Sequence, residues 1–206
     1  MTAQEKLSSD ETGPVRGAPA RRWAVAAALA LVCLAVGGAL VLLLAKPPQK
    51  SLCSGPAPAM ALQLYDGYRG GWPGSSISLD DLKGKGVVVN FWASWCQPCA
   101  QEAADMQAAW QKYKDQGVVF VGVDYLDQEP NALQYLHQYG VDYPNGPDMA
   151  GQMAQRYAIR GVPETFFIDP QGQLTGCRQV GPIDGPGLAA RIAQILPGQP
   201  SSKLSP

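Results

Sequence analysis

The sequence has little surplus charge of either sign and few residues that bind metals. Its 206 residues include 16 Lys and Arg against 17 Asp and Glu, a net charge of -1, and a single His. Nucleic-acid-binding domains carry a large basic surface and acidic tails carry a strong negative charge, so neither class is favoured. The length is enough for one compact domain with flanking segments, but not comfortably for two.

Charged residues are also absent from residues 23–45, a run of 23 positions. As a helix rising about 1.5 Å per residue, this run extends roughly 34 Å and predicts a single transmembrane helix. The alternative is a buried core helix, but a small domain could hardly enclose a helix that is apolar all round. Lys46, Pro47 and Pro48 follow the run in place of a small-residue cleavage site. We therefore expect an uncleaved anchor.

Composition divides the remaining chain into tails, a linker and one domain. Residues 1–22 and 197–206 lack a periodic apolar pattern and are expected to be disordered. Residues 46–60 carry four prolines and predict a semi-stiff linker. The domain is expected over residues 61–196. The charged residues beside the apolar run favour a cytoplasmic N-terminus by a small margin: Arg16, Arg21 and Arg22 precede it, and Lys46 and Lys50 follow it.

Within the domain, two apolar runs at 86–92 and 117–124 are too continuous for a one-sided sheet and predict central strands. Between them, Met106, Trp110 and Tyr113 recur at helical spacing, which predicts a β-α-β unit. Further elements are expected as follows: helices at 131–139 and 149–158 and from Asp184 onward, a hairpin of 165–169 with 173–180, and a small strand pair at 61–67 and 75–82.

Cys96, Gln97, Pro98 and Cys99 stand where the first central strand gives way to its helix. Cysteines spaced in this way on a first helical turn lie close enough to form a disulfide. The first thiol also faces unpaired backbone N–H groups, which favour thiolate over thiol. Cys96 is therefore expected to be an exposed nucleophile and Cys99 a shielded resolving thiol. Pro98 costs little there, because first-turn N–H groups lack partners within the helix.

Other interpretations of this cysteine pair are weaker. Half of a zinc site would need further ligands, and the remaining candidates, Cys33, Cys53, Cys177 and His137, show no second pair with ligand spacing. A purely structural disulfide stays open. A peroxidatic site is disfavoured because Val89 and Ala93 stand where Pro and Thr normally precede such a cysteine. We expect Cys177 to be a buried small residue, Cys33 to face lipid or a helix, and Cys53 to be unpaired or intermolecular.

The segment VVVNFWASWCQPCAQE resembles the thioredoxin superfamily, specifically the membrane-anchored branch of the TlpA, ResA and CcmG/DsbE types. The resemblance spans roughly residues 61–196. It implies a thioredoxin-like three-layer α/β/α fold with a central mixed sheet, plus one N-terminal transmembrane helix. It also implies that Pro163, after Gly161 and Val162, is a cis proline packed against the cysteines. Glu164, directly after Pro163, looks most like the CcmG/DsbE type.

Glu102 matches a glutamate that this branch holds near the dithiol. Three residues after Cys99, its side chain lies on the same helix face and could take the proton of that thiol. The alternative is an exposed glutamate favoured by the helix dipole. Asn90 supports the first interpretation, because thioredoxins place a buried Asp at the matching position. Residues expected to support the site are Trp95, Gln97, Pro98, Val162, Pro163 and Glu164.

The resemblance implies a thiol:disulfide oxidoreductase that needs no cofactor and no metal. It further implies protein disulfide substrates, among them apocytochrome c, and a membrane electron donor of the DsbD/CcdA kind. A reducing dithiol needs such a donor outside the cytosol, so we expect a single-pass protein of the bacterial cytoplasmic membrane with its catalytic domain on the outer side. Two alternatives remain, a thiol oxidant or isomerase for secreted proteins and a non-catalytic tethered adaptor.

Overall fold

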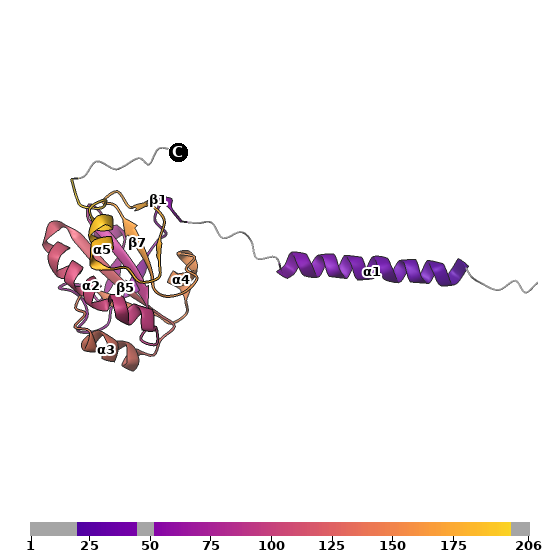
Figure 1. Cartoon of the computed structure of the whole chain (residues 1–206), viewed down its shortest axis with the longest axis horizontal. Coiled ribbons are helices and arrows are strands. Elements are labelled where there is room, and N and C mark those ends of the chain that lie inside the picture. The colour runs from indigo at the N-terminus through magenta and orange to yellow at the C-terminus, as the bar shows by residue number, and fades with distance from the viewer. Residues whose placement is uncertain (1–19, 45–51, 199–206) are drawn as a thin grey trace, which may run out of the picture. The chain divides into compact units, whose positions relative to one another are not determined.

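The computed structural model describes residues 20–44 and 52–198. The chain divides into two units, Met1–Gln49 and Lys50–Pro206, which are coloured by residue number in Figure 1. Residues 1–19 of the predicted N-terminal tail, 45–51 around the start of the predicted linker, and 199–206 of the predicted C-terminal tail lie outside the described residues.

The first unit contains helix α1, Ala20–Leu44. It covers residues 23–44 of the predicted apolar run and includes large exposed side chains such as Trp23, Leu29 and Leu34. Over the described residues, no helix is both long enough and apolar enough to cross a membrane. The membrane span expected over residues 23–45 is therefore not confirmed and stays a prediction.

The second unit is built on a mixed sheet with the strand order β1-β8-β7-β4-β5-β6. Strands β4, β5 and β6 run parallel, whereas β7 is antiparallel to β4, and β9 also pairs with β7. The strands of this sheet are β1 Ser54–Pro56, β4 Gly86–Trp92, β5 Val118–Tyr125, β6 Asn145–Asp148, β7 Glu164–Ile168, β8 Gln173–Thr175 and β9 Gln179–Val180. Central strand β4 is buried along its whole length, as its continuous apolar sequence predicted.

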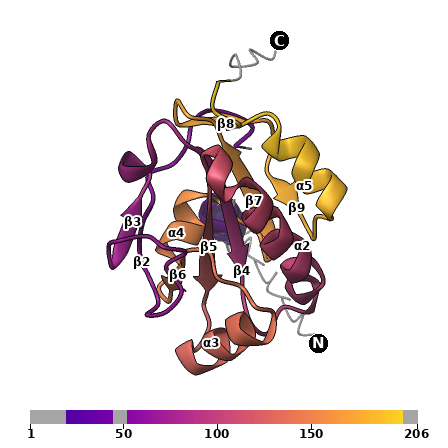
Figure 2. The same ribbon diagram turned by 90° about the vertical axis from the view of Figure 1, so that its left-hand side faces the viewer.

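Two apolar cores cover the two faces of the sheet. Helices α2 (Gln97–Tyr113), α3 (Glu129–Gln138) and α5 (Gly185–Ile192) contribute to the core that contains Val88 of β4. Figure 2 shows α2 and α5 together on this face. The other core contains Val87 and Val89 and is covered by α4 (Gln152–Arg156), the hairpin of β2 (Ala61–Gln63) with β3 (Ser76–Ser78), and the 3-10 turn Asp80–Leu82. Alternation along β4 thus produces three layers.

The predicted α/β fold with a central mixed sheet is confirmed, with shifts at element boundaries. Strand β4 has the predicted bounds, and α5 begins after an Asp184 side chain that accepts the Gly187 N–H at 2.8 Å. Helix α4 is shorter than predicted, since Gly151 enters it with a left-handed φ of 64°. Strand β6 was not predicted, because its sequence Asn-Gly-Pro-Asp is typical of a turn.

The start of the domain and the roles of two cysteines need correction. Cys53 is bonded to Cys177, so neither is unpaired, and Cys177 is exposed rather than buried. Strand β1 pairs with β8 directly after Cys53, which brings residues assigned to the linker into the folded unit. The predicted second hairpin strand, 173–180, is split into β8 and β9 at Gly176, whose φ is 72°.

Candidate active site

The cysteine pair lies at the N-terminus of α2, close to the C-terminal end of the central strand β4. Cys96 is the N-cap residue, with extended backbone angles, and its Sγ accepts a hydrogen bond from the Cys99 N–H at 3.1 Å. Cys96 and Cys99 form a disulfide whose Cα atoms are 5.3 Å apart. A sulfur in a cap position accepts a hydrogen bond from a backbone N–H and lies at the positive end of the helix dipole. Both interactions stabilise a thiolate.

The two sulfurs differ in access, but less than the sequence predicted. Cys96 is 4% exposed and Cys99 1% exposed, so the prediction of an exposed Cys96 is wrong for this disulfide form. Cys96 nevertheless lines a shallow groove between α2 and α3, whose other lining residues include Gln97, Tyr135 and Tyr139, whereas Cys99 does not. An incoming thiol or disulfide therefore reaches Cys96 first.

The loop before Cys96 is fixed by contacts with the loop after β5. Asp127 accepts a hydrogen bond from the Ser94 N–H at 2.5 Å, and the Trp95 indole N–H lies 3.4 Å from the Leu126 carbonyl oxygen. Trp95 is 60% exposed, which leaves its ring free to form a docking surface beside the groove. Gln97 and Pro98 are also exposed at the helix start. Asp127 carries no motif and was missed in the sequence.

The Val162–Pro163 peptide bond is cis, as the resemblance implied. Val162 packs against the same apolar core that contains Cys96 and Cys99. The Pro163 carbonyl oxygen accepts a hydrogen bond from the Gly181 N–H at 3.0 Å. The loop is therefore connected both to the core around the cysteines and to the segment that follows β9.

Glu102 is buried one helical turn beyond Cys99. Its carboxylate accepts hydrogen bonds from the Asn90 side-chain amide at 2.8 Å and from the Ile183 N–H at 3.0 Å. Burial raises the pKa of Glu102 to about 7, although both hydrogen bonds favour the ionised form and oppose this rise. With 3% of its surface exposed, Glu102 is not the exposed helix-start glutamate of the alternative interpretation. It can hold or release a proton near neutral pH.

Glu164 follows Pro163 and is 1% exposed. It accepts a hydrogen bond from the Arg160 N–H at 2.8 Å and pairs with the Arg178 guanidinium at 2.8 Å. Arg178 also donates to the Ala158 carbonyl oxygen. Glu164 thus supports the site by linking the backbone before the cis proline to Arg178, and over the described residues its hydrogen bonds and its ion pair do not reach the cysteines.

A second buried acid, Asp124, lies at the same end of the sheet. Burial raises its pKa to about 7, and a hydrogen bond from the Tyr65 hydroxyl at 2.8 Å opposes the rise. The neighbouring carboxyl of Asp127 raises the pKa of Asp124 further. The position at the C-terminal end of an apolar strand was the only sequence signal that could have singled out Asp124.

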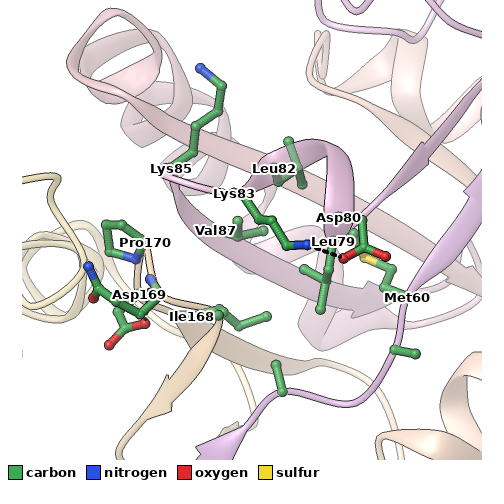
Figure 3. A pocket seen from close by; sticks show the side chains of 14 residues that line it. Met60, Leu79, Asp80, Leu82, Lys83, Lys85, Val87, Ile168, Asp169 and Pro170 are labelled. Atoms are coloured by element: carbon green, nitrogen blue, oxygen red, sulfur yellow. Dashed lines mark hydrogen bonds and ion pairs between the residues drawn. The ribbon is translucent and has the colours of Figure 1, made fainter.

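Over residues 20–44 and 52–198, no three His, Cys, Asp or Glu side chains are grouped so that they could hold a metal ion. A hollow of about 280 Å³ lies near the start of β4, lined by Val87, Leu82 and Ile168 (Figure 3). The Lys83–Asp80 ion pair, at 2.8 Å, stands beside it. This hollow contains none of the predicted site residues.

The sheet topology, the cis proline and a disulfide at a helix N-terminus define a thioredoxin-like protein. The AhpC/TSA family profile matches residues 54–176, and the chain belongs to that family. It is 39% identical to the thiol-disulfide oxidoreductase ResA of Oceanobacillus iheyensis over 100 residues, 48% of this chain and 52% of that protein. It is 38% identical to ResA of Bacillus subtilis over 101 residues, 49% of this chain and 56% of that protein.

A solved structure supports the same assignment. The thiol:disulfide interchange protein of the thioredoxin family from Chlorobium tepidum has a TM-score of 0.60 and 28% identity, covering 72% of this chain and 99% of the other. The chain spans about half the length of the curated relatives it matches. The predicted resemblance to thioredoxin-like oxidoreductases is therefore confirmed at the level of family and fold.

Proposed function

We propose that this chain is a thiol:disulfide oxidoreductase whose reacting groups are Cys96 and Cys99. The observation that carries the proposal is the position of the Cys96 sulfur at the cap of α2, bonded to Cys99 and within 3.1 Å of the Cys99 N–H. The names of the ResA relatives support the same activity.

The reaction begins from the reduced pair. The Cys96 thiolate attacks a substrate disulfide, forming a Cys96–substrate bond while the other substrate sulfur leaves as a thiolate. Glu102 accepts the Cys99 proton, and the Cys99 thiolate then attacks the Cys96 sulfur. The Cys96–Cys99 disulfide forms, the second substrate sulfur leaves, and the substrate has gained two electrons. Re-reduction of the pair requires two electrons from a separate dithiol donor.

We further propose that the predicted span of residues 23–45 tethers the domain outside the cytoplasmic membrane, and that it acts there as a reductant in cytochrome c maturation, with a donor of the DsbD/CcdA kind. The uncharged run of residues 23–45 supports the tether. The Cys53–Cys177 disulfide supports an oxidising compartment, since Cys177 is exposed and the cytosol reduces such bonds. The cytochrome role rests on the resemblance.

Trapping tests the activity. In a Cys99→Ala chain the resolving thiol is missing, so mixed disulfides through Cys96 are expected to accumulate and to disappear on treatment with a reductant. The matched control, Cys96→Ser with Cys99→Ala, is expected to form none. If Cys99→Ala yields no adduct with a model disulfide peptide, the proposed chemistry is wrong.

Two further measurements test the finer proposals. The reduction potential of the Cys96–Cys99 pair, measured against glutathione, is expected to be that of a reductant. A value of about -120 mV would indicate an oxidant instead. For the tether, the full chain is expected to float with phospholipid vesicles and a chain lacking residues 23–45 is expected to remain in solution. Equal recovery of both chains in the soluble fraction would exclude the anchor.

A further inference from the structure

We propose that the Cys53–Cys177 disulfide positions the active-site carboxylate Glu102, through the chain between Cys177 and Ile183. We call residues 177–183 the bridging segment. The proposal rests on the proposed oxidoreductase function only for the role of Glu102 in the reaction. The positioning itself is a structural claim that is measured without turnover.

The bridging segment is bonded to Cys53 at its first residue and hydrogen-bonded to Glu102 at its last. At its start, Cys177 is bonded to Cys53, 124 positions earlier in the chain. At its end, the Ile183 N–H donates to the Glu102 carboxylate at 3.0 Å. Between them, the Gly181 N–H donates to the carbonyl oxygen of the cis residue Pro163. One short stretch of backbone therefore contacts both the buried carboxylate and the cis-proline loop.

The backbone pairing of the bridging segment is short. Strand β8 ends at Thr175, the chain turns at Gly176, and only Gln179 and Val180 resume pairing with β7. The disulfide lies at this interruption and ties the segment to Cys53. The next residues after Cys53 form β1, which pairs with β8. The crosslink thus stands where the backbone pairing of this part of the chain is interrupted.

Arginine contacts surround the crosslink and show what else holds the segment. The Arg191 guanidinium donates to the Cys177 carbonyl oxygen at 2.8 Å, and Arg178 pairs with buried Glu164. These contacts fix the first two residues of the segment. Neither contact reaches Ile183, whose own side chain is buried in the core. The crosslink therefore acts on the Ile183 N–H through Gln179 and Val180, which pair with β7, and through Gly181.

The bridging segment also shields Glu102 from solvent. A hollow on the surface is lined by Glu102 together with Gln179, Pro182 and Ile183 of the segment. If the segment loosens, water reaches the carboxylate. Since burial is the main cause of the raised Glu102 pKa, hydration is expected to outweigh the lost Ile183 hydrogen bond and to lower that pKa.

Other titratable groups around Glu102 are separable from this effect. Tyr135 of α3 and Tyr143 before β6 interact with its charge, and burial raises the pKa of both above the range of the experiment. Asp105, Asp184 and Arg191 line the same hollow. The carboxyl signal of Glu102 must therefore be followed directly and not through activity.

The disulfide can be opened without touching the reacting pair. Reduction by dithiothreitol transfers two electrons and two protons to the Cys53–Cys177 bond, giving two thiols and oxidised dithiothreitol. Cys177 is exposed and Cys53 partly so, which makes the bond accessible. In a full chain carrying Cys96→Ser and Cys99→Ser, this bond is the disulfide available for reduction.

The test follows the Glu102 carboxyl carbon by NMR in that full chain, before and after reduction. We expect the titration midpoint to fall by roughly one pH unit on reduction and to return on reoxidation. A Cys53→Ser/Cys177→Ser chain should show the lowered midpoint without reductant. A Cys33→Ser chain without reductant should keep the midpoint of the parent chain. An unchanged midpoint in a folded chain overturns the proposal. Unfolding on reduction overturns it too, because the bond would then stabilise the whole fold and not position Glu102. Trapping through Cys96 would still succeed in either case.

Discussion

The side-chain amide of Asn90 donates a hydrogen bond to the carboxylate of Glu102 at 2.8 Å and joins β4 to α2 inside the core. The same amide donates to the Thr165 hydroxyl at 3.0 Å, which fixes its orientation. A second carboxylate at position 90 would repel Glu102 and raise its pKa further. With an amide at position 90, Glu102 is the single carboxylate of this pair, and it lies one helical turn after Cys99.

We expect Glu102→Gln to slow the resolving step by about 10²-fold or more near pH 7, because Gln cannot accept the Cys99 proton. The wild-type rate should rise with an inflection near pH 7, matching the raised pKa of Glu102, and the variant should lose this inflection. Single-turnover reduction of a model disulfide from pH 5 to 9 measures both. Asp105→Asn, one turn further along α2, is the control and should keep the wild-type profile.

Stability should fall as the pH rises from about 4 to 7. Glu102 and Asp124 have pKa values raised to about 7, so the folded chain keeps protons that the unfolded chain has released in this window. Below it both states are protonated, and above it both are ionised. For Glu102 the loss is on the order of 3 kcal/mol. Denaturant unfolding at several pH values checks this, and Asp124→Asn should flatten the slope.

Arg178→Gln is expected to destabilise the fold by about 3–5 kcal/mol, because it leaves the buried Glu164 carboxylate without its ion partner. Adding Glu164→Gln should recover a large part of this loss, since no buried charge then remains. A double-mutant cycle by chemical denaturation gives the coupling between the two side chains. Equal losses in the single and double variants would contradict an energetic pairing.

Gly146→Ala should weaken the fold strongly. A Cβ built on Gly146 would lie 1.8 Å from the Gln63 carbonyl oxygen, a backbone atom that cannot move aside cheaply. At Gly161 nothing lies within 4 Å of such an atom, so Gly161→Ala is the matched control. We expect the control to change the free energy of unfolding by less than about 1 kcal/mol. A loss in Gly146→Ala as small as that of the control would show instead that strand β6 shifts to accommodate the added Cβ.

Local pattern allowed much of the fold to be predicted. The continuous apolar run of β4 and the cap residue Asp184 each act through near neighbours in the chain, so their elements were found with small boundary errors. Strand β6 was missed because its burial comes from the neighbouring strand β5 and from the close approach of Gln63, and not from its own turn-like residues.

Four of the five cysteines show the same division. Cys96 and Cys99 are paired by spacing on one helical turn, which a sequence displays. Cys53 and Cys177 are 124 positions apart, and no spacing rule selects this pairing over others. Only the pairing of β1 with β8 brings the two together.

By itself the sequence determined the α/β class, the cysteine pair at a helix start and the candidate carboxylate, since each depends on residues near one another in the chain. The tertiary structure decided how that carboxylate behaves. Burial between β4, α2 and the chain at Ile183 moves the Glu102 pKa toward neutrality. Desolvation depends on which distant segments exclude water, and that is a property of the packed molecule.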